Sequence, residues 1–406
     1  MNIVMPNDVK VIIEKLTENG YEAYAVGGCV RDSIIRRVPG DWDITTSATP
    51  MEVKALFRRT IDTGIAHGTV TIMMGHNGYE VTTYRLDGEY EDGRHPKSVE
   101  FTSSLREDLR RRDFTINAMA YNDSLGMVDM FGGMEDLKKG VIRCVGNAID
   151  RFTEDALRML RAVRFSAQLG FEIEENTCNA IRTLAPNLSK ISQERIHTEL
   201  AKLLLSKHPD YIRKAYELGI TKIVLPEYDI IEDKEMVERF LKELPEVISY
   251  KYGAILMHLE SPQAVKTLKR LKLDNDTIDK MGKLVKYHKM VMPDNEIITR
   301  KILSVTGKEC FRDVLIFEKK YYEINGAYED VAKVEKAMEL VETVVSRGDC
   351  YSIKDLAING QDLIKAGVKP GKELGEILKR CLEDVIAEPK LNNYDDLMKK
   401  SFSYLH

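Results

Sequence analysis

The sequence predicts an α+β fold, with a small-sheet head followed by a remainder built of helices. Short β-branched or alternating runs bounded by Gly, Asn and Asp occur in the first 145 or so residues. From about residue 150 onward, apolar residues recur at three- and four-residue spacing and strand signals become rare. The 406 residues are enough for two or three domains, and 43% hydrophobic residues are ample for buried cores.

Five strands are expected in the head, over residues 22–26, 41–45, 69–74, 80–83 and 99–101. One helix should begin near Val30, and a second should follow Thr49-Pro50, where Thr caps the helix and Pro occupies its first turn. The stretch 85–97 is polar, contains glycine and has no period, which predicts a mobile loop. Beyond residue 150, prolines divide the chain into successive helices, at Pro186, Pro209, Pro226, Pro245, Pro262 and Pro293.

Composition and charge exclude several classes of protein. No run of 18 apolar residues occurs and the first residues lack a secretory signal pattern, so we expect no membrane segment and a cytoplasmic location. The six cysteines form no Cys-X-X-Cys pair, so neither a zinc site nor a disulfide framework is supported. The net charge of −5 does not indicate a nucleic-acid binder, but residues 262–290 are locally basic. This basic run is either a solvated helix face or a contact surface for a phosphate backbone.

The most informative stretch is Gly27–Asp32 followed by Gly40–Ile44, which combines a flexible loop, an arginine and two carboxylates. Because side chains alternate along a strand, Asp41 and Asp43 should point to the same face. Carboxylates held in this way bind hard cations such as Mg²⁺, which complete their shell with water and substrate phosphates. The arrangement suits phosphoryl or nucleotidyl transfer by two metals. The structural alternative is that both acids cap or solvate a turn.

A second cluster is the run Arg110–Ala118, which contains three consecutive arginines and Asp113. Consecutive arginines project in different directions, so at least one should turn inward to meet Asp113 or a ligand. One interpretation is an ion pair that joins a loop to the sheet. Beside a triphosphate site, a guanidinium fork on phosphate is the other interpretation.

The third cluster opens the helical part at residues 151–165. We predict Thr153 as the N-cap of a helix, followed by two acids that favour the positive helix end. One face of this helix is apolar. The opposite face carries three arginines with too few local acids to pair them: Arg158, Arg161 and Arg164.

Asp155 and Arg158 lie one helical turn apart and offer a way to select nucleobases. Cytosine and adenine present an amino donor beside a ring-nitrogen acceptor, whereas guanine and uracil present a carbonyl acceptor beside an N–H donor. A carboxylate accepts hydrogen bonds and a guanidinium only donates them. The pair would therefore accept C and A and leave buried groups unpaired against G and U. Arg161 and Arg164 would then reach phosphate or primer.

In this order, the clusters resemble the motifs of the class II tRNA nucleotidyltransferases, the CCA-adding enzymes of bacteria and eukaryotes and their poly(A) polymerase relatives. The first cluster is similar to the family's metal motif, Arg111–Thr115 to its ribose-recognition motif and Glu154–Arg158 to its templating helix. Asp129–Gly133 resembles the hinge between head and neck, and Ile191–Ile196 the segment that steadies the templating helix. The resemblance covers about residues 20–205, with weaker similarity to the end of the chain.

The resemblance implies a nucleotidyltransferase head over residues 1–145, a nucleotide-selecting neck over 146–205 and a tRNA-binding body and tail over 206–406. It also implies that one site adds C, C and A to the acceptor arm of tRNA, from CTP and ATP, without a nucleic-acid template. Two Mg²⁺ ions are the expected cofactors, and no protein partner is predicted.

The resemblance also assigns roles to residues of this sequence. Asp41 and Asp43 would hold the metals. Glu80, on a neighbouring strand, is a candidate third catalytic carboxylate or else an ordinary exposed strand residue. The nucleotide would be bound by Gly28, Arg31, Arg112, Asp113, Asp155, Arg158, Arg161 and Arg164.

Two positions depart from the family pattern. Cys29 and Trp42 stand where the family usually has a small residue and an aliphatic one, and we expect changed packing rather than lost chemistry. Three functions stay open: full CCA addition, addition of only A or only CC, and a catalytically silent tRNA-binding module. A loop over residues 85–97 argues against a CC-only enzyme but not against an A-only one. Thr63–Val70 resembles the CCA-adding form rather than the poly(A) polymerase form.

Overall fold

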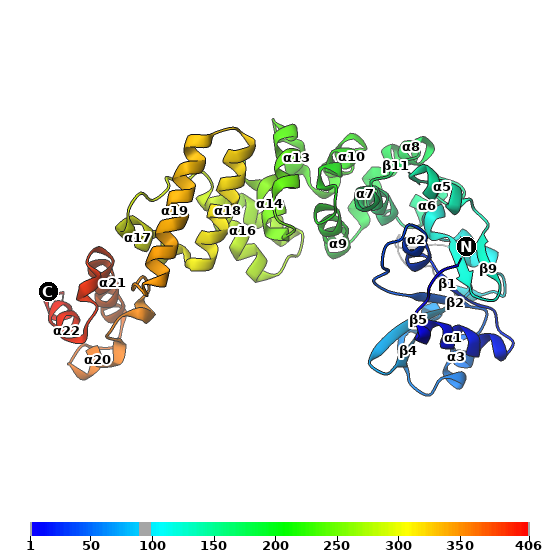
Figure 1. Cartoon of the computed structure of the whole chain (residues 1–406), viewed down its shortest axis with the longest axis horizontal. Coiled ribbons are helices and arrows are strands. Elements are labelled where there is room, and N and C mark those ends of the chain that lie inside the picture. Colours follow the sequence, from blue (N-terminus) through cyan, green and yellow to red (C-terminus); the bar gives the residue numbers. More distant parts are fainter. Residues whose placement is uncertain (1, 89–98, 405–406) are drawn as a thin grey trace. The chain divides into compact units, whose positions relative to one another are not determined.

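The computed structural model describes residues 2–88 and 99–404. The chain divides into two compact units, Met1–Glu232 and Asp233–His406. The described residues of the second unit form helices and connections, whereas the first unit also contains the main sheet (Figure 1). The predicted α+β fold with a helical C-terminal part is confirmed. The predicted domain boundaries near residues 145 and 205 fall inside the first unit and stay predictions.

The first unit is built around a mixed sheet. Its strands are β1 (Ala23–Val26), β2 (Asp43–Thr46), β3 (Thr60–Gly64), β4 (Thr69–Met74), β5 (Asn77–Thr83), β8 (Met119–Asn122) and β9 (Gly126–Asp129). They lie in the order β3-β4-β5-β2-β1-β8-β9. β2 pairs antiparallel with β1 and parallel with β5, so it occupies the middle of the sheet. Asp43, which begins β2, pairs with Val26 of β1, and the pairing with β5 begins one residue later at Ile44.

Several predicted strands are present with shifted ends. The strand predicted over 69–74 is confirmed as β4, and the one over 80–83 extends back to Asn77 in β5. The strand predicted over 41–45 begins only at Asp43, because its pairing with β1 ends where Asp43 faces Val26. Sequence patterns do not predict β3, β8 or β9. Asp and Gly interrupt β3, and β8 contains no β-branched residue.

The stretch 85–97, predicted to be a mobile loop, begins as a strand. Arg85–Asp87 forms β6, which pairs antiparallel with β7 (Val99–Phe101) in a separate two-stranded sheet. The strand predicted over 99–101 is thereby confirmed. The rest of the predicted loop, from residue 89 onward, lies outside the described residues.

Short helices accompany the sheet: α1 (Asn7–Glu18), α2 (Gly28–Ile34), α3 (Pro50–Leu56), α4 (Leu105–Arg110) and α5 (Gly133–Lys139). α3 begins as predicted, with Pro50 in its first turn. The backbone N–H of Glu52 donates to Thr49 Oγ1 at 3.4 Å, and that of Thr49 donates to Glu52 Oε2 at 2.7 Å. This reciprocal pair is a capping box and satisfies two N–H groups of the helix start. α2 begins at Gly28, two residues before Val30.

The first unit continues with α6 (Ala148–Glu154), α7 (Leu157–Leu169), α8 (Glu175–Leu184), α9 (Gln193–Leu204), α10 (Ile212–Glu217), α11 (Thr221–Val224) and α12 (Pro226–Asp229). α7 packs against α9, and this contact brings together two segments separated by a whole helix. β11 (Glu172–Ile173), which pairs in parallel with β10 (Val141–Ile142), interrupts the part predicted to be helical.

The second unit contains α13 (Lys234–Glu243), α14 (Ile248–Leu256), α15 (Ser261–Arg270), α16 (Asn275–Tyr287), α17 (Glu296–Thr306), α18 (Lys308–Ile324), α19 (Tyr328–Ser346), α20 (Gly360–Lys365), α21 (Lys372–Ala387) and α22 (Tyr394–Ser403). The prolines divide the chain as predicted: Pro262 lies in the first turn of α15, and Pro293 precedes α17. Asp274 caps α16 by accepting a hydrogen bond from the backbone N–H of Thr277.

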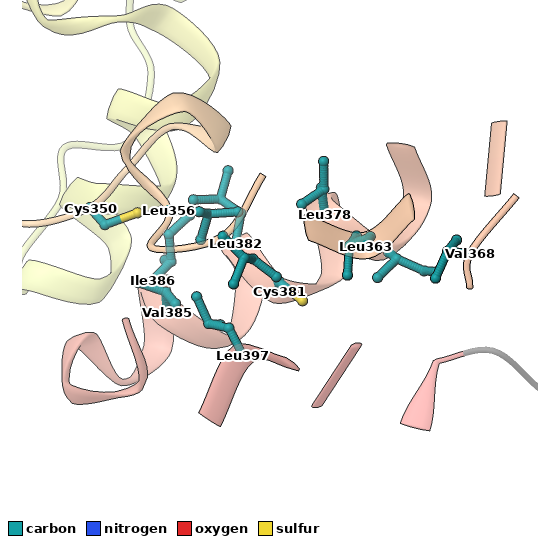
Figure 2. Close-up of a cluster of buried hydrophobic side chains, with 12 residues drawn as sticks. Cys350, Leu356, Leu363, Val368, Leu378, Cys381, Leu382, Val385, Ile386 and Leu397 are labelled. Atoms are coloured by element: carbon teal, nitrogen blue, oxygen red, sulfur yellow. The ribbon is translucent and has the colours of Figure 1, made fainter. Parts of the chain in front are cut away.

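The last helices enclose an apolar core of their own. Leu382, Val385 and Ile386 of α21 gather with Leu397 of α22 and with Leu356 (Figure 2). The core also contains Cys350 and Cys381, which are free thiols. Burial raises the pKa of both thiols to about 11, so they act here as small apolar side chains. None of the described helices has the length and apolar character that crossing a membrane requires.

Candidate active site

A cavity of about 540 Å³ in the first unit gathers most of the predicted site residues. Its lining comes from the start of α2, the edge of β2, the segment after α4, the start of α7 and one residue of α9. Among the predicted residues it contains Gly28, Arg31, Asp41, Asp43, Arg112, Asp113, Asp155, Arg158, Arg161 and Arg164. Glu80 does not line it. Residues up to 168 positions apart are thus brought to one cavity, as Gly27 and Arg195 both line it and 195 − 27 = 168.

The glycine loop before α2 makes room for an arginine. Gly27 has a φ of +82°, and a Cβ atom there would lie 3.2 Å from Nη1 of Arg112. A side chain at this position would meet both a strained backbone and this guanidinium. Arg31, on α2, is 7% exposed and donates to Asn117 Oδ1 at 2.6 Å and to Asp32 Oδ1 at 2.9 Å. α2 therefore contributes Arg31 to the cavity, and the missing side chain at Gly27 leaves space there for Arg112.

Asp41 and Asp43 lie together at the head side of the cavity. Both acids line the cavity, whereas Trp42 and Ile44 do not, although Asp41 precedes β2 and burial does not alternate within the strand, because Ile44, Thr45 and Thr46 are all buried. Within the described part of the chain, neither carboxylate has a hydrogen-bond or ion-pair partner. Asp43 is solvent-accessible, but partial desolvation by the surrounding protein, together with Asp41 and Glu80, raises its pKa to about 6, although Arg112 opposes the shift. These acids repel one another, and Arg112 compensates their charge only in part.

Glu80 is close to this pair through the sheet. Val81 pairs with Ile44 across the parallel β2–β5 ladder, so Glu80 and Asp43 are the preceding residues on neighbouring strands. Its effect on the Asp43 carboxyl agrees with that placement. Cys29, one of the departures from the family pattern, is 2% exposed and its Sγ lies 3.3 Å from the Val26 carbonyl oxygen. It does not line the cavity, as expected for a packing residue.

The arginine run does not use Asp113 as its acid, contrary to the first interpretation of that cluster. Arg111 donates to Asp108 Oδ1 from Nε at 3.0 Å and from Nη2 at 2.7 Å, and Arg112 donates to Asp108 Oδ2 at 3.3 Å. Arg110 is exposed and reaches Glu107 at 3.8 Å. Asp108 is therefore the acid that pairs with Arg111 and Arg112. It lies about one helical turn before them, on α4, because the chain is still helical there.

The predicted single helix from Thr153 is wrong. Thr153 lies in the last turn of α6, where its Oγ1 donates to the Ile149 carbonyl oxygen at 2.8 Å. The chain leaves the helix at Asp155, with φ −144° and ψ 103°, and α7 begins at Leu157. Asp155 Oδ1 accepts a hydrogen bond from the backbone N–H of Leu157 at 3.0 Å, so Asp155 caps the start of α7. This break turns the Asp155 carboxylate toward the cavity.

The arginines of α7 are not short of acids, because other elements supply them. Arg158 donates to Glu154 at 2.7 Å and to the Arg111 carbonyl oxygen at 3.0 Å. Arg161 donates twice to Asp113 Oδ2, at 2.9 and 2.7 Å. Burial alone would raise the pKa of Asp113, but Arg161 and Asn117 outweigh it and hold this pKa well below its usual range.

α9 closes this side of the cavity. Arg164 is 6% exposed and donates to Glu199 Oε2 at 2.7 Å, and Arg161 approaches Glu199 at 3.7 Å. Arg195 donates to Asp155 Oδ2 at 2.7 Å. The ring of Phe165 lies within 5.3 Å of Arg31, Arg161 and Arg164, with the Arg164 guanidinium at 3.5 Å from the ring centre.

Comparison with known proteins gives consistent matches along the chain. Residues 23–143 match the poly A polymerase head domain, 170–231 the RNA and SrmB-binding site of polymerase A, and 249–400 tRNA nucleotidyltransferase domain 2. The CCA-adding enzyme of Lactiplantibacillus plantarum is 40% identical over 398 residues, covering 96% of this chain and 94% of that protein. The chain belongs to the class II tRNA nucleotidyltransferase family, the family of the CCA-adding enzymes.

Other relatives of this tRNA nucleotidyltransferase agree. The CCA-adding enzyme of Leuconostoc mesenteroides is 38% identical over 404 residues, with 98% of this chain and 96% of that protein covered. The crystal structure of the Bacillus stearothermophilus CCA-adding enzyme in complex with CTP has a TM-score of 0.77 at 31% identity, with 98% and 99% of the two chains covered. The Thermotoga maritima CCA-adding enzyme complexed with tRNA has a TM-score of 0.64 at 21% identity, with 100% of each chain covered, and this likeness concerns the fold alone.

Several cavity residues of the tRNA nucleotidyltransferase are absent from the sequence-based site: Gly27, Arg111, Asn117, Leu157, Phe165 and Arg195. Four lay within quoted motifs: Gly27 in the metal motif, Arg111 in the ribose motif, Leu157 in the templating helix and Arg195 in the segment that steadies it. Asn117 lay in the arginine cluster, but nothing local identified its partner Arg31, which is 86 residues away. Such pairings are found only when the fold is known.

The acids at the β2 edge fit a divalent metal, on which this family generally depends. Asp41 and Asp43 offer oxygen ligands, and a bound cation would relieve the repulsion that raises the Asp43 pKa. Among the residues that the structure describes, no group of three His, Cys, Asp or Glu side chains is arranged to hold a metal. Two carboxylates leave room in a coordination shell for water and substrate phosphates, which is the usual environment of Mg²⁺.

Proposed function

We propose that this chain adds C, C and A to the 3′ end of tRNA from CTP and ATP without a nucleic-acid template. The observation that carries the proposal is the meeting, in one cavity, of two unpartnered carboxylates with a carboxylate and an arginine suited to cytosine and adenine. The similarity to CCA-adding enzymes over nearly the whole chain supports it. The substrates are CTP, ATP and the acceptor arm of tRNA.

Asp41 and Asp43 are the proposed ligands of two Mg²⁺ ions. When bound, these ions would activate the terminal hydroxyl of tRNA and neutralise the leaving pyrophosphate. The two side chains orient the ions at the start of β2, which lies in the middle of the sheet. Glu80 is the proposed third carboxylate, acting on the same pair from the neighbouring strand.

Gly28, Arg31 and Arg112 form the proposed binding surface for the phosphates and sugar. The start of α2 allows close approach of the backbone at Gly28. Arg112 has one described hydrogen-bonded partner, Asp108, and its Nε is buried without a partner. Its remaining donors suit the oxygens of a triphosphate. Asp113 supports this surface indirectly by holding Arg161.

Asp155 and Arg158 are the proposed selectors of the incoming base, with Arg161 and Arg164 beside them. Each carboxylate oxygen of Asp155 accepts one described hydrogen bond, so acceptor capacity remains. The described hydrogen bonds of Arg158 come from Nη1 and Nη2, so its Nε–H is among the donors left for a base. One acceptor beside one donor matches the Watson–Crick edges of cytosine and adenine and opposes those of guanine and uracil.

The test uses three tRNAs, ending at the discriminator base, at C and at CC, each given CTP and ATP separately and together. Full CCA addition predicts incorporation at every stage, in the order C, C, A. Extension of only one intermediate would assign an A-adding or CC-adding enzyme instead. Binding of all three tRNAs without incorporation, in Mg²⁺ buffer, would leave a silent binding module.

A further inference from the structure

Asp108 is a fully buried carboxylate directly behind the cavity. It lies on α4, has 0% exposure and does not line the cavity itself. Both of its oxygens are used: Oδ1 accepts two hydrogen bonds from Arg111, and Oδ2 accepts one from Arg112 at 3.3 Å and one from Thr45 Oγ1 at 3.1 Å. It therefore connects two cavity arginines to β2, the strand that begins with Asp43.

The charge of Asp108 is maintained by these neighbours. Burial would raise the pKa of its carboxyl, but Arg112 and Arg111 outweigh burial and hold the pKa below its usual value. One buried negative charge thus faces two guanidinium groups, which are 18% and 19% exposed. The group retains a net positive charge on its cavity side, where an anionic ligand would bind.

Arg112 is placed from two sides. Asp108 holds Nη2 from behind, and the absent side chain of Gly27 leaves room for Nη1 in front. An unrestrained arginine loses substantial side-chain entropy when it binds a ligand. A guanidinium already held in place by a buried acid avoids much of that loss.

We propose that Asp108 is a positioning residue for the triphosphate of the incoming nucleotide and acts through Arg112. The proposal rests on the proposed function, in which Arg112 binds that nucleotide. Asp108 contacts neither substrate nor metal. It orients the guanidinium toward the β- and γ-phosphates and fixes it relative to the carboxylate edge of β2.

The test compares CTP with CMP, which lacks the β- and γ-phosphates, by equilibrium binding in Mg²⁺ buffer. Asp108→Asn keeps the side-chain shape but removes the charge and places an amide donor near two guanidinium groups. We expect the Kd for CTP to rise about tenfold and that for CMP to change less than about twofold. Equal weakening of CTP and CMP, or no weakening of CTP in the folded variant, would overturn the proposal.

A double-mutant cycle with Arg112→Ala separates this inference from the proposed function. If Asp108 acts through Arg112, Asp108→Asn should have no further effect on CTP binding in the Arg112→Ala background. An undiminished effect in that background would overturn the inference. If Arg112→Ala itself leaves CTP binding unchanged, the proposed role of Arg112 fails, and the inference fails with it. If only Asp108→Asn is without effect, the role of Arg112 survives and the inference alone is wrong.

Two further variants control for folding. Glu318→Gln is matched in burial, since Glu318 is 0% exposed and pairs with His288 at 2.6 Å in the other unit. It should leave both Kd values unchanged. If Asp108→Asn does not fold, Thr45→Val removes the hydroxyl that hydrogen-bonds to Asp108 at 3.1 Å and to the Thr82 carbonyl oxygen at 3.3 Å, and it leaves the arginines intact. A two- to threefold loss in CTP binding alone is then expected, and an unchanged CTP affinity would contradict the proposal.

Discussion

The carboxylates around the cavity fall into two groups that differ in their partners. Asp41 and Asp43, at the edge of β2, have no cationic partner in hydrogen-bonding distance among the described residues. Asp113 and Asp155, on the arginine-rich side, each accept hydrogen bonds of 2.7 Å from an arginine. The cavity thus contains an unpartnered pair and a partnered set.

The difference shows how one residue type serves two purposes. A carboxylate with a guanidinium at 2.7 Å is neutralised and fixes the direction of that arginine. Asp41 and Asp43 repel one another, and this repulsion adds to the effect of desolvation in raising the pKa of Asp43, with only partial compensation by Arg112. A bound metal ion would remove this repulsion. Asp41 and Asp43 would thereby gain the positive partner that Asp113 and Asp155 already have in an arginine.

The largest effect should come from breaking the unpartnered pair. Asp43→Ala is expected to slow CMP incorporation about 10³-fold or more, because one carboxylate cannot hold the metals that stabilise the transferring phosphate. Affinity for tRNA should stay within about twofold, since RNA phosphates are bound by cationic residues. Rapid-quench incorporation and filter binding measure the two quantities.

Asp62→Ala is the control for that variant. Asp62 lies on β3, pairs with Lys54 at 2.8 Å and does not line the cavity. It should keep full activity. A fully active Asp43→Ala protein would show that Asp43 does not hold the metals. The difference between the unpartnered pair and the partnered set would then have no functional meaning.

Asp155 tests whether a partnered carboxylate can also read a base. Asp155→Ala is expected to lower the preference for CTP over UTP about 100-fold, because the acceptor for the exocyclic amino group is lost. Competition between the two nucleotides during single additions to tRNA measures the ratio. Asp150→Ala, an exposed acid on α6 outside the cavity, should leave the ratio unchanged. Equal slowing with both nucleotides would mean that Asp155 only caps α7.

Local signals in the sequence predict the unpartnered pair better than the partnered set. The placement of Asp41 and Asp43 at one cavity and the capping box at Thr49 depend on neighbours within three residues, and both are present. Thr153 has the right composition for an N-cap but is not one. Asn147 caps α6 six residues earlier, and tertiary packing then breaks the helix at Asp155.

Partners from other elements are what the sequence does not predict. Glu199 lies 35 residues after Arg164, and Asp113 lies 48 residues before Arg161. Nothing in the composition of α7 identifies these acids, so its arginines seem in isolation to lack partners. Predicting the pairs requires the packing of α9 on α7 and of both against the head, which follows from the whole core.

The Asp113–Arg161 pair predicts a pH-dependent stability of definite sign. The folded pKa of Asp113 lies below its unfolded value of about 3.9, so its contribution is fully present above that pH and is lost as pH falls toward the folded pKa. At pH 7, Asp113→Asn should cost about 2 kcal/mol of unfolding free energy, allowing for the partial exposure of Arg161. Urea unfolding at pH 7 and pH 3 should show the difference from wild type narrowing at the lower pH. A difference that widens would contradict the assignment.

The smallest effect should come from extending the contrast to lysines of the second unit. Lys269 and Lys286 are exposed and line a cavity of about 310 Å³ between α15 and α16. By contrast, Lys319 is paired with Glu335 at 2.7 Å, and Lys333 is paired with Asp330 at 2.8 Å. If unpaired charges are the ones that meet ligands, the double variant Lys269→Ala, Lys286→Ala should weaken tRNA binding about three- to tenfold. It should also reduce the slope of log K against log salt by about one to two.

The double variant Lys319→Ala, Lys333→Ala removes the same charge and should change neither quantity. Equal losses in both variants would mean that only net charge matters, and that the basic run over 262–290 is a solvated helix face.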